Sequence, residues 1–409
     1  MAEPSQIKGR NMKMIRRYFK GLQSSYFLFG PRGTGKTTWL KHNLRNALRV
    51  DLLEPETYRL YKARPERLKE LIEGNPDQRI IILDEIQKAP ELLDVVHSLM
   101  ENKPKLQFIL TGSSSRKIKQ SGMNLLGGRA LIRTLHPFMH SESKHEFDLN
   151  QSLRFGLIPL VVSAKNPKET LEAYITLYMN EEVQMEGLVR NIGNFARFLE
   201  AISFSHGAVL NVSNAARECE VKRKTVEGYI EVLYDLLLAY SLPIFTKRAK
   251  RAVIQHPKFY FFDTGVFRTL RPKGPLDQPT EIEGAALEGI VAQHLRAWID
   301  YSQSSLKLYY WRTKAGTEVD FIIYGDECFW AIEVKNTPKV RRKELRSLKT
   351  FHQDYPECTL VFVYRGSERL LIDNVLCIPC DRFLEGMKPN HPLIETKKEP
   401  ARGFEPPTY

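Results

Sequence analysis

The sequence is poor in cysteine and has no long apolar run. Its 409 residues include five cysteines, a small and odd number that does not favour a disulfide-stabilised secreted protein and suits a reducing cytoplasm. Cys377 and Cys380 form one C-x-x-C without a second pair, so we expect no metal or redox role there. No apolar stretch reaches the roughly 18 residues that a membrane helix needs, and the first residues are too polar and basic for a signal peptide. We therefore expect a cytoplasmic protein that does not enter a membrane.

Acidic residues are too few to balance the basic ones. Lysine and arginine number 61, aspartate and glutamate number 48, and the formal net charge is +13. Such a charge favours an anionic partner, nucleic acid above all. The hydrophobic content of 42% is ordinary for a globular protein, and the length favours two or three domains.

One glycine-rich stretch lies between a short apolar run, residues 26–29, and a segment with the character of a helix. Strand, G-x-x-x-x-G-K-T and helix is the context in which backbone N–H groups surround a polyphosphate. Glycines let the backbone approach closely, Lys36 can reach the β- and γ-phosphates, and the Thr37 hydroxyl can bind Mg²⁺. The residues expected to bind ATP here are Gly30, Pro31, Arg32, Gly33, Thr34, Gly35, Lys36, Thr37 and Thr38.

Polar residues follow two further apolar strands. Asp84 and Glu85 end the strand 79–83, where Asp84 is placed to hold Mg²⁺ and Glu85 to polarise the attacking water. The strand 106–110 is followed by Thr111 and Ser113, the two candidates for sensing the γ-phosphate. Arg129 is a candidate arginine finger, in cis or across subunits, with a surface salt bridge as the equal alternative. Together these residues predict a catalytic ATPase site.

The first 135 residues alternate between strand-like and helix-like segments. This order predicts an α/β fold, a parallel sheet with helices on both faces and the nucleotide at the carboxyl ends of the strands. Residues 12–19 form a basic amphipathic pattern, which predicts a helix packed beside the nucleotide pocket.

Helical periodicity dominates after residue 137. Residues 170–178 and 191–204 predict helices of a lid and connector. Residues 210–233 read as helix, tight turn and helix, with Lys222, Arg223 and Lys224 in the first turn of the second helix, where they would face a DNA groove. A strand at 241–245 and the basic run 247–251 would form a wing. The alternative is a winged helix that serves only as a protein spacer.

A third set of strands carries a spaced group of charges. The segments 318–324 and 328–335 predict a hairpin, in which Glu333 and Lys335 share one face and Asp320 lies nearby. Two carboxylates that hold Mg²⁺ and a catalytic lysine are typical of metal-dependent nucleases, and Glu288, on the predicted helix 278–300, can add a further carboxylate. The alternative is a hairpin with exposed charges. Residues 389–409 predict a disordered tail.

The combination of these motifs resembles prokaryotic AAA-type ATPases that carry a winged helix and a C-terminal domain of unknown function, a domain similar to the PD-(D/E)xK nuclease fold. The resemblance covers nearly the whole chain except the tail. It rests on residues 30–37, 83–87, 111–114, 127–129, 262–265, 284–288, 317–320 and 333–335.

The resemblance implies a division of the chain into an AAA-type P-loop domain, a helical lid with a winged helix, a nuclease-like domain and a tail. We place these at residues 1–140, 141–246, 247–388 and 389–409. The function it implies is ATP binding and hydrolysis on or near DNA, and a homo-oligomer is compatible with it. The alternatives are an ATP-regulated, metal-dependent DNA endonuclease and a signalling or scaffold ATPase whose C-terminal domain only binds a partner.

Overall fold

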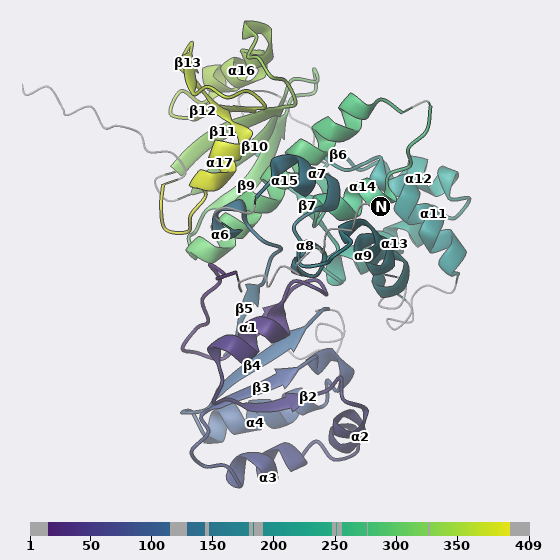
Figure 1. Ribbon diagram of the computed structural model, residues 1–409, viewed down its shortest axis with the longest axis vertical. Coiled ribbons are helices and arrows are strands. Elements are labelled where there is room, and N and C mark those ends of the chain that lie inside the picture. The colour runs from purple at the N-terminus through teal and green to yellow at the C-terminus, as the bar shows by residue number, and fades with distance from the viewer. Residues whose placement is uncertain are drawn as a thin grey trace, which may run out of the picture.

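The chain folds into three units, which Figure 1 shows from the purple N-terminal part to the yellow C-terminal part. Within the described part of the chain, no helix combines the length and the apolar character that crossing a membrane requires. The computed structural model describes residues 15–114, 129–143, 147–179, 183, 191–247, 251, 256–275, 277–325 and 328–392, without the side chains of 177–179. The predicted tail, 389–409, lies outside these residues beyond position 392.

The first unit is built on a five-stranded parallel sheet with the strand order β2-β3-β4-β1-β5. Its elements are β1 (Tyr26–Phe29), α1 (Lys36–Asn43), β2 (Leu48–Asp51), α2 (Pro55–Ala63), α3 (Arg67–Glu73), β3 (Ile80–Asp84), η1 (Ile86–Lys88), α4 (Leu92–Asn102), β4 (Gln107–Gly112) and β5 (Leu131–Thr134). The predicted parallel sheet is confirmed.

Alternation along the strands explains why helices cover both faces of this sheet. Phe27 and Phe29 of β1 belong to the core beneath α3 and α4, whereas Tyr26 and Leu28 belong to the core that includes Trp39 of α1. The segment before β1 differs from its prediction. Residues 15–20 have no helical structure, although they do pack beside the phosphate-binding loop, as described below.

The second unit is mostly helical with one small sheet. Its elements are α6 (His140–Ser143), α7 (Leu149–Phe155), α8 (Pro159–Val162), α9 (Pro167–Ala173), η3 (Tyr174–Met179), α11 (Ile192–Ser203), β6 (Ala208–Val209), α12 (Val212–Glu218), α13 (Arg223–Asp235), β7 (Ala239–Leu242), β8 (Lys258–Phe261) and α14 (Thr264–Leu270). Helices α12 and α13 stand where the two helices of the helix-turn-helix were predicted. Side chains cap α11 and α12, through Asn191 and Asn211.

Strand β8 joins the second unit rather than the third. It pairs antiparallel with both β6 and β7, so the small sheet has the order β6-β8-β7. The sequence assigned β8 to the third unit because it follows the basic run and precedes the next long helix. Long-range pairing of this kind leaves no local signal, and the second unit therefore extends past the predicted boundary at residue 246.

The third unit is a six-stranded mixed sheet with the order β13-β14-β12-β11-β10-β9. Its elements are α15 (Pro279–Ser302), β9 (Lys307–Arg312), β10 (Glu318–Gly325), β11 (Cys328–Lys335), η4 (Arg342–Leu345), α16 (Arg346–Asp354), β12 (Thr359–Tyr364), β13 (Leu370–Ile372), β14 (Val375–Pro379) and α17 (Cys380–Gly386). Helix α16 covers one face, and α15 with α17 covers the other.

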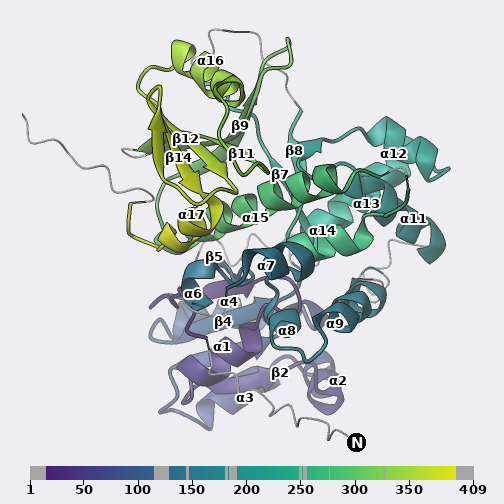
Figure 2. The ribbon, with the colours of Figure 1, turned by 45° about the horizontal axis from the view of Figure 1, so that its top comes forward.

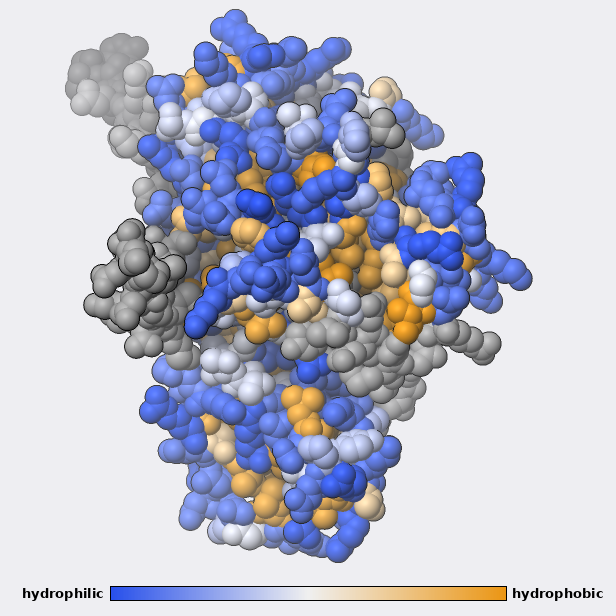
Figure 3. All heavy atoms as spheres, turned by 45° about the vertical axis from the view of Figure 1, so that its right-hand side comes forward, coloured by the Kyte–Doolittle hydropathy of each residue, from blue (hydrophilic) through white to orange (hydrophobic). Residues whose placement is uncertain are grey.

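Helix α15 connects the three units. Figure 2 shows it crossing the middle of the molecule, above α6, α7 and the first sheet. One continuous core cluster contains residues of α1, the second unit, α15 and the third sheet, so the units are packed together. Figure 3 shows a mostly hydrophilic outer surface on which the apolar residues form separate small patches.

Candidate nucleotide site and carboxylate cluster

The loop between β1 and α1 has the backbone shape that a phosphate requires. Gly33 and Gly35 have φ values of 81° and 90°, a region that residues with a Cβ rarely adopt. A Cβ built on Gly35 meets nothing within 4 Å, so the space beside this residue is open. The first N–H groups of α1 begin at this point, because Gly35 is its N-terminal cap. The residues of this loop therefore fit a nucleotide phosphate.

Two predicted ligands of the magnesium ion lie next to each other. The Thr37 hydroxyl donates a hydrogen bond to Asp84 Oδ2 at 3.1 Å, and the Asp84 side chain is fully buried. A hydroxyl and a carboxylate are oxygen ligands of the type that Mg²⁺ prefers, so this pair fits the ion. The guanidinium of Arg49 in β2 also pairs with Asp84, a contact that the sequence did not indicate. The Lys36 ammonium is buried and donates to the carbonyl oxygens of Gly30 and Pro31, at 2.6 and 3.3 Å.

Thr111 of β4 contacts Asp84 and Glu85 at the carboxyl end of β3. Its hydroxyl contacts the Asp84 carboxylate and accepts a hydrogen bond from the Glu85 N–H at 3.1 Å. The side chain is fully buried between β3 and β4. Of the two candidate sensors, Thr111 therefore holds the Asp84 carboxylate in place.

Glu85 is held in a defined orientation. Its backbone is left-handed, with φ 61° and ψ 48°, which turns the chain sharply after β3. The Gln87 amide donates to Glu85 Oε2 at 2.5 Å and to Ser113 Oγ at 3.0 Å, and Ser113 Oγ lies 3.4 Å from the same carboxylate oxygen. The sequence missed Gln87. The available signal was its place in the stretch 83–87 that carries the family resemblance. A Cβ on Gly112 would come within 2.7 Å of Gln87 Oε1, so a larger residue there would displace the Gln87 amide.

Arg129 lies away from the nucleotide edge of the sheet. It precedes β5, so it stands at the amino ends of the parallel strands. Its guanidinium pairs with Glu101 near the carboxyl end of α4 at 3.1 Å, and nearly half of its side chain is exposed. This is the surface salt bridge that was the alternative, and the structure does not bring Arg129 to the phosphate loop in cis. A role across subunits stays a prediction.

Three successive carbonyl oxygens of the phosphate loop are bound from outside the first unit's sheet. Arg32 O accepts from the Tyr174 hydroxyl at 3.0 Å, Gly33 O from the backbone N–H of Leu160 at 3.3 Å, and Thr34 O from Arg17 at 3.0 Å. These groups belong to η3, α8 and the segment before β1. The predicted lid, through Tyr174, therefore contacts the backbone of the phosphate loop.

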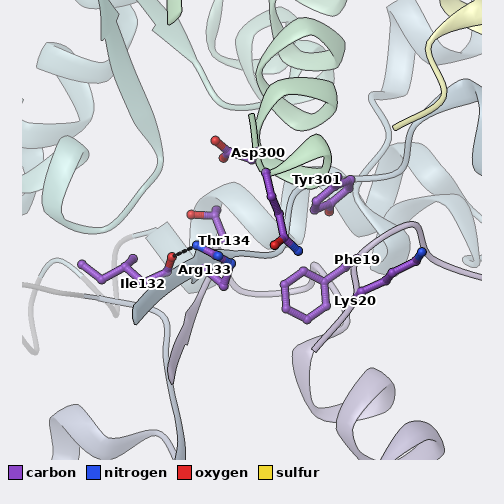
Figure 4. A pocket seen from close by; sticks show the side chains of 8 residues that line it. Phe19, Lys20, Ile132, Arg133, Thr134, Asp300 and Tyr301 are labelled. Atoms are coloured by element: carbon purple, nitrogen blue, oxygen red, sulfur yellow. Dashed lines mark hydrogen bonds between the residues drawn. The ribbon is translucent and has the colours of Figure 1, made fainter. Parts of the chain in front are cut away.

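A cavity of about 230 Å³ lies where the first unit meets the end of α15. Figure 4 shows Phe19 and Lys20 on one side, strand β5 on another, and Asp300 and Tyr301 above them. Thr134 lines the cavity and is the last residue of β5. It pairs with Phe29, which directly precedes the phosphate loop. The cavity is thus adjacent to the nucleotide site and shared between two units.

Three consecutive exposed cations of the second unit lie at the start of α13. Lys222, Arg223 and Lys224 are all exposed, and Arg223 also pairs with Glu227. The predicted wing is different. Of its described cations, Lys247 lies over the ring of Tyr324 and Arg251 pairs with Asp354, so both contact the third unit. Positions 248–250 lie outside the described residues.

The third unit brings the predicted charges together. Strands β10 and β11 pair antiparallel, as predicted, and a register shift between Val319 and Ile322 places a bulge at Asp320. The backbone N–H of Val334 donates to Asp320 Oδ2 at 2.9 Å. The Lys335 ammonium lies 2.6 Å from Glu333 and 3.8 Å from Asp320.

A lysine that the sequence did not single out occupies the centre of this carboxylate cluster. The Lys258 ammonium, on β8, lies 2.9 Å from Glu288 and 3.5 Å from Asp320. It also lies 2.5 Å from Glu318, and its side chain is 1% exposed. The Tyr260 hydroxyl donates to Glu288 at 2.6 Å. Across the described residues, no three acidic, histidine or cysteine side chains are arranged to hold a metal ion.

The metal site predicted from Glu288, Asp320 and Glu333 stays a prediction. In this structure an ammonium from another unit pairs with Glu288 and Asp320, and it leaves part of the negative charge of the cluster uncompensated. Burial, together with Asp320, raises the pKa of Glu288 to about 7 and that of Glu333 to about 8. Burial lowers the pKa of Lys258, but its carboxylate neighbours outweigh this and raise it above the ordinary value.

Comparison with known protein families gives a functional description for the first unit and none for the other two. Residues 23–144 match a family model described as an AAA domain. The N-terminal unit is similar to an AAA-type P-loop domain. Residues 146–277 and 283–383 match two models, each described as a domain of unknown function. The AAA unit therefore supports nucleotide binding and ATPase activity, and the models say nothing about the chemistry of the other two units.

Individual relatives add little about function. Two uncharacterized proteins, one from Mycobacterium bovis and one from Mycobacterium tuberculosis, are each 27% identical over 318 residues, which is 75% of this chain and 69% of the relative. A solved structure of the replication initiator DnaA, bound to AMPPCP and single-stranded DNA, aligns at 15% identity over 52% of this chain and 82% of its own. Its TM-score is 0.23, and a likeness of that size supports no argument.

Proposed function

We propose that this protein binds and hydrolyses ATP with Mg²⁺, and that its second unit brings the ATPase to duplex DNA. One observation carries the ATPase part. The Thr37 hydroxyl lies 3.1 Å from Asp84 Oδ2 at the phosphate loop. The carboxylate of the adjacent Glu85 is oriented by Gln87 and Ser113. A site that only bound the nucleotide would not need an oriented carboxylate beside the metal ligands.

Each residue has a defined role in this proposal. The loop N–H groups and Lys36 bind the phosphates. To do so, the Lys36 ammonium gives up its hydrogen bonds to the carbonyl oxygens of Gly30 and Pro31 and donates to the phosphates instead. Thr37 and Asp84 would hold Mg²⁺, which neutralises charge on the β- and γ-phosphates when bound. Glu85 polarises the attacking water. The Gln87 amide keeps the Glu85 carboxylate in position, so Gln87 is a positioning residue.

The ATPase proposal is tested by two substitutions with different expected effects. Lys36→Ala removes the phosphate contact and should abolish tight ATP binding. Glu85→Gln should bind ATP as the wild type does and lose hydrolysis by about 10²-fold or more, because an amide cannot accept the proton of water. Calorimetry measures binding and phosphate release measures hydrolysis. Lys41→Ala, on the exposed face of α1, is the control and should change neither. Wild-type hydrolysis by Glu85→Gln would disprove the role of Glu85.

The DNA part rests on the exposed cations at the start of α13. The order helix, strand, helix, helix, strand and strand from α11 to β8, with a three-stranded sheet, supports a winged helix with α13 as the element that faces DNA. Lys222, Arg223 and Lys224 would together make about three phosphate contacts. The logarithm of the binding constant should then fall with the logarithm of salt concentration with a slope of about −3.

Charge reversal tests the DNA interface. Changing Lys222, Arg223 and Lys224 to Glu should abolish this salt-dependent binding, which fluorescence anisotropy with labelled duplex DNA measures. The same reversal at three exposed cations of the first unit is the matched control, and those cations are Arg45, Lys62 and Lys105. Equal losses in both variants would mean that only net charge matters, and the winged helix would then be a spacer between protein units.

The endonuclease alternative has less support, because Lys258 pairs with Glu288 and Asp320, two of the three carboxylates that would hold the metal ion.

A further inference from the structure

The ammonium of Lys258 meets the requirements of a permanent counter-ion. A lysine ammonium has three N–H donors, and three carboxylates surround this one, those of Glu288, Glu318 and Asp320. They come from two different elements of the third unit, α15 and β10. All donor capacity of the ammonium is therefore used inside the cluster.

Backbone strand pairing also holds Lys258 in place. It is the first residue of β8, where it pairs with Leu242 of β7 and Val209 of β6. Its side chain is almost completely buried, and its ammonium lies 5.5 Å from the centre of the Tyr310 ring. The ammonium cannot leave the cluster as an exposed side chain could, because it would have to break strand pairing or cross a packed core.

A divalent cation would have to compete with the ammonium for this space. It would lie among the same oxygen atoms at a few ångströms from the ammonium, and like charges at that distance in a buried site repel strongly. Arg312 and Lys335 add two more cations at the edge of the cluster, where they pair with Glu318 and Glu333. Three cations thus already face the four carboxylates.

We propose that Lys258 is a built-in cation that replaces the metal ion of the cluster, and that the third unit is consequently a non-hydrolytic module fastened to the second unit by this ammonium. The carboxylates then serve to bind β8 to α15 and β10. This inference is independent of the ATPase and DNA proposals, because no residue of the cluster contributes to either site.

Manganese binding to the full-length protein without nucleotide tests the proposal. Electron paramagnetic resonance distinguishes free from bound Mn²⁺. Wild type and Asp320→Asn should bind Mn²⁺ equally weakly. Lys258→Met, which keeps the length of the side chain and removes its charge, should gain affinity of roughly a hundredfold or more, because the repelling charge is gone and Glu288, Glu318 and Asp320 lose the counter-ion that they share. Lys335→Met is the matched control and should gain nothing, since Lys258 is still present.

Two results would overturn the proposal. One is Mn²⁺ binding by the wild type that Asp320→Asn removes. The other is Mg²⁺-dependent cleavage of DNA by the wild type that Asp320→Asn abolishes while ATP hydrolysis continues. Both comparisons use wild type and Asp320→Asn alone, so the decision does not depend on whether Lys258→Met folds. Asn can still accept the hydrogen bond from Val334 that Asp320 accepts.

Discussion

Gly289 shows how far one missing side chain determines the packing of the central helix. It lies in the buried middle of α15, and a Cβ built there would come within 2.3 Å of His206 Nε2. The His206 ring stacks on Phe267 with centroids 4.1 Å apart and accepts a hydrogen bond from the Phe261 N–H. Burial lowers the pKa of His206 to about 3, so the ring stays neutral and keeps this acceptor. The histidine cannot move aside without losing both contacts.

The substitution Gly289→Ala should therefore destabilise the protein by about 1–3 kcal/mol, the usual cost of overpacking a core. Gly284 is the matched control in the same helix, because a Cβ there meets nothing within 4 Å. Gly284→Ala should stabilise by up to about 1 kcal/mol, since alanine favours a helix over glycine. Urea unfolding followed by circular dichroism measures both. Shifts of the same sign in the two variants would contradict the close contact with His206.

At the same scale, the sequence identified the residues whose roles depend on local spacing. Thr37 lies beside Lys36, and Asp84 with Glu85 ends a recognisable buried strand, so motif and strand pattern sufficed. Arg49 and Lys258 were missed because each acts through a partner that folding alone brings near, whereas Gln87 lies only two residues from Glu85 and was missed although it stands in the motif. Lys258 is 62 residues from Asp320, and nothing in its own segment distinguishes it from an exposed lysine.

At the scale of elements, helices and parallel strands could be predicted better than the pairing of distant strands. The alternation of strands and helices in the first unit follows from periodicity, and the observed sheet is of the predicted type. Strand β8 lies inside the predicted third unit, 247–388, yet it pairs with β6 and β7 of the second. The wing was expected to be free for DNA, yet its described ends contact the third unit. Tertiary packing decided both cases.

The segment before β1 illustrates the same limit in a different way. Its apolar and basic positions have helical spacing, but residues 15–20 are not helical. Their hydrogen bonds go elsewhere: the Tyr18 N–H donates to Glu142 and the Tyr18 hydroxyl to Ser141 O. Side-chain and backbone partners on α6 replace the hydrogen bonds of a helix, and local propensity is overruled.

At the scale of the whole molecule, Arg17 connects the phosphate loop to both other units. Its guanidinium binds Glu142 of α6 at 3.1 Å, Thr34 O of the loop at 3.0 Å and the Tyr301 hydroxyl of α15 at 3.3 Å. It also donates to His136 O at 2.6 Å, and its side chain is 7% exposed. Only a planar fork with five donors can serve so many acceptors at once. The loop geometry therefore depends on elements outside the AAA unit.

The substitution Arg17→Lys tests this dependence. Lysine keeps the positive charge near Glu142, but its single ammonium cannot reach Thr34 O, His136 O and Tyr301 together. We expect the free energy of unfolding to fall by about 2 kcal/mol, as for loss of a charged hydrogen bond, and the KM for ATP to rise several-fold because the loop loses one of its outer supports. Thermal unfolding and steady-state ATPase assays measure the two effects. Arg16→Lys, at the exposed neighbouring position, should change neither. A lower melting temperature with an unchanged KM would mean that Arg17 serves folding alone and that the phosphate loop does not depend on it.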